Sequence, residues 1–442
     1  MMMKKRLLAL GMAGVMAFSL AGCGSGNGSA GTEGGAKAES KTEAEAGTEN
    51  GTAGGGGEKV KLTFYDWSDE QSYLDPAVAA YNAQSDVAEV EVVYFPPTEY
   101  ADKILASFSS GVEFDVLGVN GIAPYGDYQN KKTIQDITSY VEQSGLDTSV
   151  YGQVFEECNQ EGIFGLPYRQ AVWLLFINEE LFEKAGLDVP TEQLTWNEYR
   201  ELAKKLTTDK TYGGLVGMDN FVYMQQMGGS VMDEDTTIIR ENLELWKALH
   251  EDGSHVPFEE KLEMGQNVGS LFTTAPAETV AMFQNGTWGV AAYNLKYESG
   301  EMPFKYKVMP MPIPEGSRDY TAPCSMNFLS VSKTSKHPAE AYDFIQWMCT
   351  HDGAKIIAEN STLTAYNDDE IKDIYLKAAE QSDDTLAKIV FSENNAIDTK
   401  YHPKYAEVET ILKEEMELYM VGEQDIDTTM KNFESRRADV IN

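Results

Sequence analysis

The segment GLPYRQAVWLLFINEELFEKAGLDVP, residues 165–190, indicates the fold most clearly. Residues 173–178 form a continuous apolar run that ends in Asn178, a pattern typical of a strand that is buried on both faces. Residues 179–185 follow with helix-forming residues, and Gly186 stands where a helix commonly stops. A buried strand followed at once by a helix is the repeating unit of α/β proteins.

Elements of both kinds continue toward the C-terminus. Thr195 and Glu198 have the spacing of a capping box, which predicts a helix that begins at Trp196 and ends near Leu206. We expect further helices at residues 242–252, 278–284 and 338–349, a strand at 289–293 and an extended loop at 310–314.

Toward the N-terminus, strands alternate with helices in the same way. Residues 60–65, 90–94 and 114–119 alternate or are continuously apolar, which predicts three strands. Between them, the capping-box spacing of residues 68–71 predicts a helix to about residue 82, and residues 100–109 predict another. Such alternation predicts an α/β fold with mostly parallel sheets flanked by helices.

Length and charge restrict the class of protein. A chain of 442 residues with 42% hydrophobic residues is too long for one ordinary core, so two lobes are expected. The net charge of -36 argues against a nucleic-acid partner, because phosphate binding needs basic patches. The cysteines at 158, 324 and 349 allow at most one disulfide, and no cysteine or histidine spacing suggests zinc or another metal.

The N-terminus has the pattern of an export signal. Residues 4–6 are basic, and residues 7–20 form an apolar run that is too short for a mature membrane span. The sequence Leu20-Ala21-Gly22-Cys23 that follows resembles a bacterial lipobox, in which the cysteine is acylated. We therefore expect a signal peptide at 1–22, a lipidated Cys23, and a Gly- and Ala-rich tether to residue 57.

Six motifs in order carry a resemblance to a known family. They are KLTFYDW (61–67), the 165–190 segment, TWNEYRELAKKLT (195–207), MFQNGTWGVAAYN (282–294), MPMPIPEG (309–316) and SVSKTSKHPAEAYDFIQWM (330–348). Together, behind a lipobox, they resemble family 1 extracellular solute-binding proteins, the group that includes maltodextrin-binding proteins. The resemblance covers nearly everything after the tether.

The resemblance implies a periplasmic-binding-protein-like fold of two α/β lobes joined by a hinge of crossing segments. The crossings would lie near residues 168–172, 296–303 and 332–337, so that 58–168 with 296–333 form one lobe and 169–295 with 334–442 the other. Cleft closure would capture a sugar on the outer face of the cytoplasmic membrane and deliver it to an ABC permease. No cofactor and no turnover are implied.

Sugar recognition needs aromatic rings against C–H faces, and carboxylate, amide or guanidinium groups against hydroxyls. Asp69 and Glu70 could instead complement a helix dipole, Arg169 could pair with an acidic neighbour, and Asn220 could cap a helix. Trp196 and Trp288 are interpreted as packing residues. The candidate ligand-binding residues are Trp67, Asp69, Glu70, Asn120, Tyr168, Arg169, Asp219, Asn220, Tyr223, Tyr293 and Asn294.

Other functions remain open at this point. Several cleft carboxylates and the acidic composition are compatible with a polyamine, peptide or metal complex as ligand. A surface hydrolase or adhesin is disfavoured, because the Ser330-x-x-Lys333 motif lacks its companion motifs. A calcium loop at 233–244 is disfavoured as well, because Ile238 occupies the position that needs glycine.

Overall fold

We describe a computed structural model of the chain, which covers residues 59–441 except 218–220, 266–268, 274–278 and 382. The expected signal peptide, Cys23 and the tether lie outside these residues, as do the candidates Asp219 and Asn220. Within the described residues, no helix is both long and apolar enough to cross a membrane.

The first sheet begins with the strands predicted near the N-terminus. β1 (Val60–Trp67) pairs in parallel with β2 (Ala88–Phe95) and with β3 (Val116–Val119). β3 pairs antiparallel with β8 (Pro323–Val331). The three predicted strands are confirmed, and their ends differ from the prediction by about two residues or fewer.

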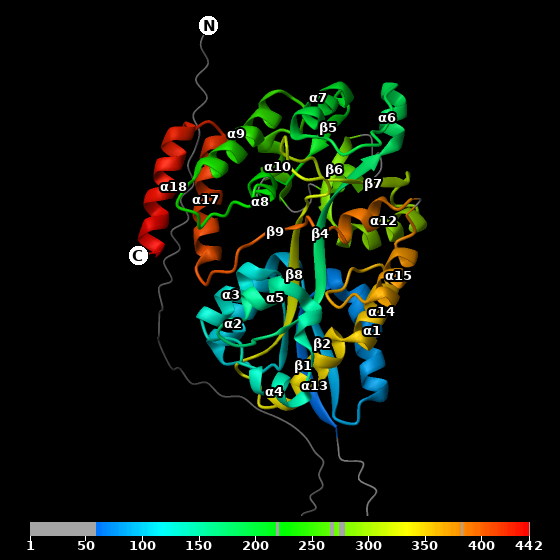
Figure 1. Cartoon of the computed structure of the whole chain (residues 1–442), viewed down its shortest axis with the longest axis vertical. Helices are drawn as coiled ribbons and strands as arrows, with labels where there is room; N and C mark the ends of the chain where they lie inside the picture. The colour runs from blue at the N-terminus through cyan, green and yellow to red at the C-terminus, as the bar shows by residue number, and fades with distance from the viewer. Residues whose placement is uncertain (1–58, 218–220, 266–268, 274–278, 382, 442) are drawn as a thin grey trace, which may run out of the picture. The chain divides into compact units, whose positions relative to one another are not determined.

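β4 (Leu166–Asn178) is 13 residues long and runs from the first sheet into the second (Figure 1). Its first half pairs antiparallel with β8, and its second half pairs antiparallel with β6 (Val280–Gly286) and β7 (Tyr306–Pro310). β6 pairs in parallel with β5 (Tyr212–Leu215), and the short β9 (Ala396–Ile397) lies parallel to β8. The strand order is therefore β2-β1-β3-β8-β4-β6-β5.

The first lobe is the part packed around the β2-β1-β3-β8 sheet. Its core joins Phe64 of β1, Phe328 of β8 and Phe344 of α13, all fully buried. The predicted helix at 338–349 is confirmed as α13. The helices around this core are α1 (Gln71–Gln84), α2 (Pro97–Ser110), α3 (Ile122–Asn130), α4 (Thr138–Ser144), α5 (Gly152–Cys158), α13 (Pro338–Cys349) and α14 (His351–Glu359).

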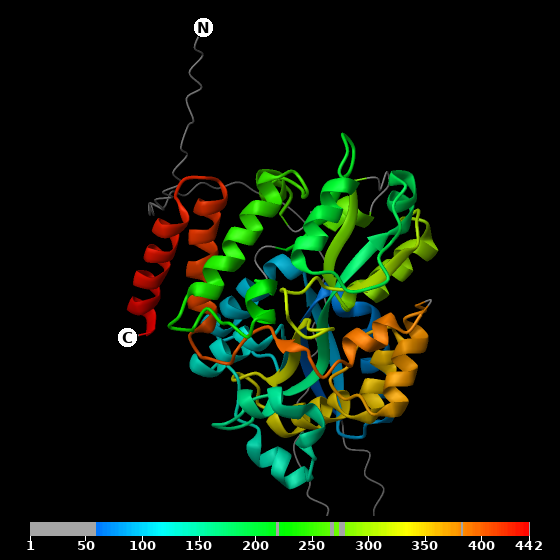
Figure 2. The same cartoon turned by 45° about the horizontal axis from the view of Figure 1, so that its top comes forward.

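The second lobe is the part packed around β4, β5, β6 and β7. The predicted stop at Gly186 and the capping box of Thr195 and Glu198 are both formed. α9, α17 and α18 lie side by side at one edge (Figures 1 and 2). The helices are α6 (Glu179–Ala185), α7 (Trp196–Leu206), α8 (Val222–Gln226), α9 (Thr237–Glu251), α10 (Phe258–Met264), α11 (Ser270–Thr273), α12 (Trp288–Ser299), α15 (Asp369–Ala378), α16 (Thr385–Val390), α17 (Tyr405–Met420) and α18 (Ile426–Ile441).

The two-lobed α/β fold is thus confirmed, but two elements near residue 286 are exchanged relative to the prediction. Residues 280–286 form strand β6 instead of a helix, because they lie between β4 and β5 and are buried on both faces. Residues 289–293 begin helix α12 instead of forming a strand. Val290 and Tyr293 are both buried, and their spacing of three residues fits one face of a helix.

The start of α1 also differs from the prediction. Residues 68–70 form a separate 3₁₀ turn, and no side chain caps either that turn or α1. Glu70, which we expected in a capped first turn, is buried and points its carboxylate at Arg169 instead. A buried cation outcompetes the local capping pattern here, because an unpaired guanidinium in the core would be far more costly.

The chain crosses between the lobes at other places than expected, except at β4. Residues 296–299 belong to α12, and the chain then enters β7, which pairs with the second-lobe half of β4. Residues 332–337 lead from β8 to α13, which packs in the first-lobe core. The assignment of whole segments to the two lobes stays a prediction, but these two connections do not cross.

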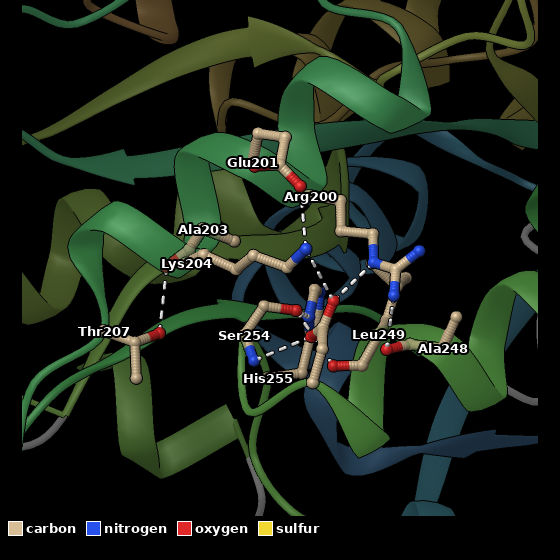
Figure 3. A network of polar contacts seen from close by, with 10 residues as sticks. Arg200, Glu201, Ala203, Lys204, Thr207, Ala248, Leu249, Ser254 and His255 are labelled. Atoms are coloured by element: carbon tan, nitrogen blue, oxygen red, sulfur yellow. Dashed lines mark hydrogen bonds and ion pairs between the residues drawn. The ribbon is translucent and has the colours of Figure 1, made fainter.

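A polar network links α7 to the end of α9 in the second lobe (Figure 3). The Asp252 carboxylate accepts from Arg200 and lies 3.2 Å from the Lys204 ammonium. It also accepts from the Ser254 backbone N–H at 3.1 Å. His255 next to it is fully enclosed, with its Nε2 3.0 Å from the Tyr199 hydroxyl and its Nδ1 2.9 Å from the Ser254 hydroxyl.

His255 of this network and the half-buried His250, whose ring centre lies 5.9 Å from that of His255, should make stability depend on pH. Burial lowers the pKa of His255 to about 3 and that of His250 to about 4, below the ordinary value of 6.5. Between pH 6.5 and 4 the unfolded chain therefore binds protons that the folded chain does not, and each histidine destabilises the fold as pH falls. By linkage we expect about 2 kcal/mol per histidine at pH 5.

The measurement is the free energy of unfolding of wild type and of His255→Gln, each by urea titration at pH 7 and pH 5. A variant comparison is needed because burial raises the pKa of Asp398 to about 7, which acts in the opposite direction. The free-energy difference between the two proteins should change by about 2 kcal/mol in favour of the variant at pH 5. A difference that stays constant between the two pH values would contradict the neutral, buried state of His255.

Candidate functional site

A cleft of ≈ 840 Å³ lies at the carboxyl ends of the second-lobe strands. Asp69, in the turn behind β1, is its single lining residue from the first lobe among the described residues. Its wall includes the indole rings of Trp173 (β4) and Trp288 (α12) and the side-chain amides of Gln284 and Asn285 (β6). The remaining lining residues are Leu215, Gly217, Phe258, Lys261, Leu262, Gly265, Gly269, Ser270, Thr273, Phe283, Tyr293, Lys296, Lys413, Met416 and Glu417.

Two tryptophans form an aromatic corner in this cleft. The rings of Trp173 and Trp288 meet edge to face, with centroids 5.0 Å apart. A Cβ on Gly286 would lie 1.9 Å from the Trp288 ring, so glycine is required for the ring to lie against the backbone there. Trp288 remains 36% exposed, which leaves part of its ring available for a ligand.

Gln284 adds a hydrogen-bond donor beside this corner. Its Oε1 accepts from the Gly217 backbone N–H at 2.8 Å. The side chain is only 3% exposed, and its Nε2 has no hydrogen-bond partner. Leaving a buried donor unpaired costs about 1–3 kcal/mol, so the site gains when a ligand brings an acceptor to Nε2.

Asn285 and Tyr293 hold each other in place. The Asn285 amide donates to the Tyr293 hydroxyl at 2.5 Å and accepts from the Gly286 N–H at 2.9 Å. The Tyr293 ring packs against Phe176 and Tyr306 at 4.9 and 5.8 Å between centroids and is 5% exposed. Tyr293 therefore lines the cleft mainly as a packed ring that positions Asn285.

A buried ion pair lies behind the aromatic corner. The Arg169 guanidinium is 2.7 Å from the Glu70 carboxylate, which also accepts from the Tyr168 hydroxyl. The Arg169 guanidinium carbon lies 6.0 Å from the centre of the Trp288 ring. The pair thus connects the turn after β1, the crossing strand β4 and the first turn of α12.

The protonation of this cluster follows from burial. Burial, and next the neighbouring Glu70, raise the pKa of Asp66 well above its ordinary value. Burial raises the pKa of Glu70 as well, while the Arg169 guanidinium and the Tyr168 hydroxyl oppose that shift. Glu70 is the carboxylate that forms the ion pair with Arg169. The alternative interpretation of Arg169, pairing with an acidic neighbour, is confirmed.

The other sequence candidates lie in different places. Trp67 is 6% exposed and packs edge to face on Tyr100 at 5.2 Å. Asn120 is exposed behind β3 and accepts from the Asn327 amide at 3.3 Å. Asn294 is held by the Tyr306 hydroxyl at 2.8 Å and by the Ala379 carbonyl at 3.1 Å. Their roles toward a ligand stay predictions.

Tyr223 lies away from the cleft. It lines a separate cavity of ≈ 240 Å³ together with Trp196, and its hydroxyl donates to Glu241 at 3.2 Å. Trp196 packs edge to face on Trp246 at 5.1 Å and donates from Nε1 to Gln226 at 2.9 Å. The interpretation of Trp196 as a packing residue is therefore confirmed.

Sequence reasoning did not place Trp173 or Gln284 in the cleft wall, and its interpretation of Trp288 as core is wrong, because Trp288 is 36% exposed. The cause is the exchange of elements around residue 286. Had residues 280–286 been predicted as a strand, Gln284 and Asn285 would have stood at its carboxyl end, where α/β sheets bind ligands. The Phe283-x-x-Gly286 pattern was the available signal.

Comparisons with known proteins agree with the two-lobed α/β fold. The family described as bacterial extracellular solute-binding protein matches residues 66–355. A putative binding protein of Brucella abortus is 22% identical over 407 residues, which is 87% of this chain and 93% of the relative. An uncharacterized lipoprotein of Streptomyces antibioticus is 22% identical over 299 residues, 61% of this chain, and the match spans 62% of that lipoprotein's length.

Solved structures share the fold. A Listeria monocytogenes ABC substrate-binding protein in complex with cycloalternan has a TM-score of 0.76 at 22% identity, covering 87% of this chain and 99% of that one. A Rhizobium etli sugar transporter in an open conformation has a TM-score of 0.71 at 23% identity, covering 86% and 99%. At these identities the likeness shows the fold.

Because Glu70 and Arg169 form a buried pair, removing one partner should destabilise the protein more than replacing both. Glu70→Leu leaves a buried guanidinium unpaired and should cost about 3–5 kcal/mol, while Glu70→Leu with Arg169→Met should cost clearly less. Glu99→Gln, which breaks the exposed pair with Lys103, is the control and should cost about 0–1 kcal/mol. Urea unfolding measures all three variants. A double variant less stable than the single one would rule out this interpretation.

Proposed function

The chain belongs to the bacterial extracellular solute-binding protein family, and we propose that it captures a sugar or oligosaccharide in the cleft for delivery to an ABC importer. Similar structures have been solved with maltose, mannotriose and cycloalternan. The proposed activity is binding and release without turnover, since the family consists of binding proteins.

The observation that carries this proposal is the corner of Trp173 and Trp288 beside the unpaired amide of Gln284. A sugar presents C–H faces that pack on aromatic rings and hydroxyls that accept hydrogen bonds. The partly exposed Trp288 ring offers the packing surface, and Gln284 Nε2 offers the donor. One wall of the cleft therefore offers both an aromatic surface for the C–H face of a sugar and a hydrogen-bond donor for its hydroxyls.

Closure of the lobes would complete the site. Asp69 is exposed and faces the cleft from the first lobe, and Asn120 is exposed at the end of the neighbouring strand β3. Both can accept hydrogen bonds from sugar hydroxyls, and Asn120 can also donate. We propose that hinge motion at β4 brings them onto a ligand already packed on Trp288.

We further propose that Cys23 is acylated and anchors the protein to the outer face of the cytoplasmic membrane. The support is the lipobox order of residues 20–23 and the Streptomyces antibioticus relative, which is described as a lipoprotein. A tether of the expected length would let the folded body reach a permease while the lipid holds it at the membrane.

Loss of the Trp288 ring should weaken sugar binding. Burying a large aromatic side chain against a ligand contributes about 1.5–3 kcal/mol, so Trp288→Ala should reduce affinity roughly ten- to a hundredfold. Calorimetric titration with maltose, mannotriose and cycloalternan provides the measurement. For wild type, a ligand at 100 times its dissociation constant should add about 2.7 kcal/mol of stability, seen as a raised melting temperature.

Trp196→Ala is the matched control, because Trp196 is a packed tryptophan of the same lobe outside the cleft. It should lower the melting temperature and leave the sugar affinity of the folded protein unchanged. Normal binding by Trp288→Ala together with lost binding by Trp196→Ala would place the ligand elsewhere. If no saccharide binds wild type, the proposed sugar function fails.

Cys23→Ala should prevent acylation and release the protein from the membrane or leave its precursor unprocessed. Metabolic labelling with a radioactive fatty acid and membrane fractionation measure both effects. Cys158→Ala is the control, since Cys158 is buried in the first-lobe core. Labelling of Cys23→Ala at the wild-type level would remove the lipoprotein proposal.

A further inference from the structure

We propose that the natural ligand is an acidic saccharide, one that carries carboxylate groups, such as an oligomer of uronic acid. This inference rests on the proposed sugar-binding function and specifies its ligand class. Its basis is that the described residues of the cleft reverse the charge balance of the chain and include an unpaired hydrogen-bond donor, Gln284 Nε2.

The charge reversal is visible in the cleft residues. The chain as a whole has 35 basic and 71 acidic residues. Among the residues that the structure describes, the cleft is lined by Lys261, Lys296 and Lys413 against Asp69 and Glu417. Lys413 also forms an ion pair with Glu409 at 2.9 Å. A protein of such net charge repels anions at long range, so local basic residues are needed for an anionic ligand to enter and stay.

Lys296 is the best placed of these cations. It lies on α12, the helix that begins with Trp288. Lys296 follows Trp288 by eight residues, which corresponds to about 12 Å along the helix axis. Its ion pair with Glu301 is 3.6 Å long and exposed, so it contributes little and can be exchanged for a ligand carboxylate. Trp288 and Lys296 would then contact the same ligand at two points more than one sugar ring apart.

The hydrogen-bonding groups of the second-lobe wall favour the same ligand. Gln284 Nε2 is a buried donor without a partner, and lysine ammonium groups only donate. The Asn285 amide oxygen accepts from the Gly286 N–H, which uses one of its two lone pairs. A carboxylate only accepts, and its hydrogen bonds with charged donors are roughly twice as strong as neutral ones.

A cationic ligand such as a polyamine fits the second-lobe wall of the cleft less well. Among the described cleft residues, a polyamine would meet three lysines, with Asp69 and Glu417 as carboxylate partners. Glu70, which the sequence offered as a further carboxylate, is buried and neutralised by Arg169. An amine ligand would also leave Gln284 Nε2 unpaired, because a protonated amine has no acceptor to offer.

The test compares acidic trisaccharides with neutral ones of the same linkage. The probes are trisaccharides of galacturonic, glucuronic and mannuronic acid, and the same compounds with each carboxylate reduced to a hydroxymethyl group. Titration calorimetry with the full-length protein should show at least one acid bound tenfold or more tightly than its reduced counterpart. Its affinity should fall when salt is raised from 0.05 to 0.5 M.

Lys296→Gln should weaken binding of that acid about five- to tenfold while changing binding of the reduced compound less than twofold. Lys431→Gln, which removes an exposed lysine of α18 outside the cleft, should change neither. Equal or tighter binding of the reduced trisaccharides, or no binding of any acid, overturns the acidic-ligand inference and leaves the sugar proposal standing if neutral sugars bind. If spermidine binds and no saccharide does, both proposals fail.

Discussion

The antiparallel pairing of β4 with both sheets is the constraint on which the rest of the structure depends. One half of the strand completes the first-lobe sheet against β8, and the other half is the centre of the second-lobe sheet between β6 and β7. A register shift between Pro167 and Arg169 marks the point where the strand leaves the first pairing pattern. Because each lobe contains part of one strand, a movement at the hinge must be absorbed within this strand and its neighbours.

The same strand positions the buried ion pair and part of the cleft wall. Arg169 and Trp173 are four residues apart on β4, so their side chains lie on the same face of the strand. Arg169 reaches back to Glu70 behind β1, while Trp173 meets Trp288 at the start of α12. The buried ion pair fixes β4 relative to the turn after β1. The two tryptophans next to it remain partly exposed. One short stretch of β4 therefore carries both the buried ion pair and part of the proposed binding surface.

Much of the fold follows from local sequence. The apolar run at 173–178, the stop at Gly186 and the capping box of Thr195 and Glu198 are all formed as predicted, because each depends on residues within one turn or one strand. The prediction failed at 280–286 and 289–293, where local preferences are ambiguous. There the pairing of β6 with two neighbouring strands decides the outcome, and that pairing joins residues far apart in the chain.

The sequence by itself determined the α/β class, the order of most elements and the family motifs, since periodicity and turn residues act over short distances. Only the tertiary structure decided which polar groups face the cleft. Glu70, Arg169 and Asn294 were reasonable ligand candidates, yet each is held by a partner that is distant in sequence, such as Tyr306 for Asn294. Gln284 and Trp288 became candidates because long-range packing buries Gln284 and leaves Trp288 partly exposed in the same wall of the cleft. Burial and hydrogen-bond pairing are properties of the assembled fold, and they determine which side chains remain available to a ligand.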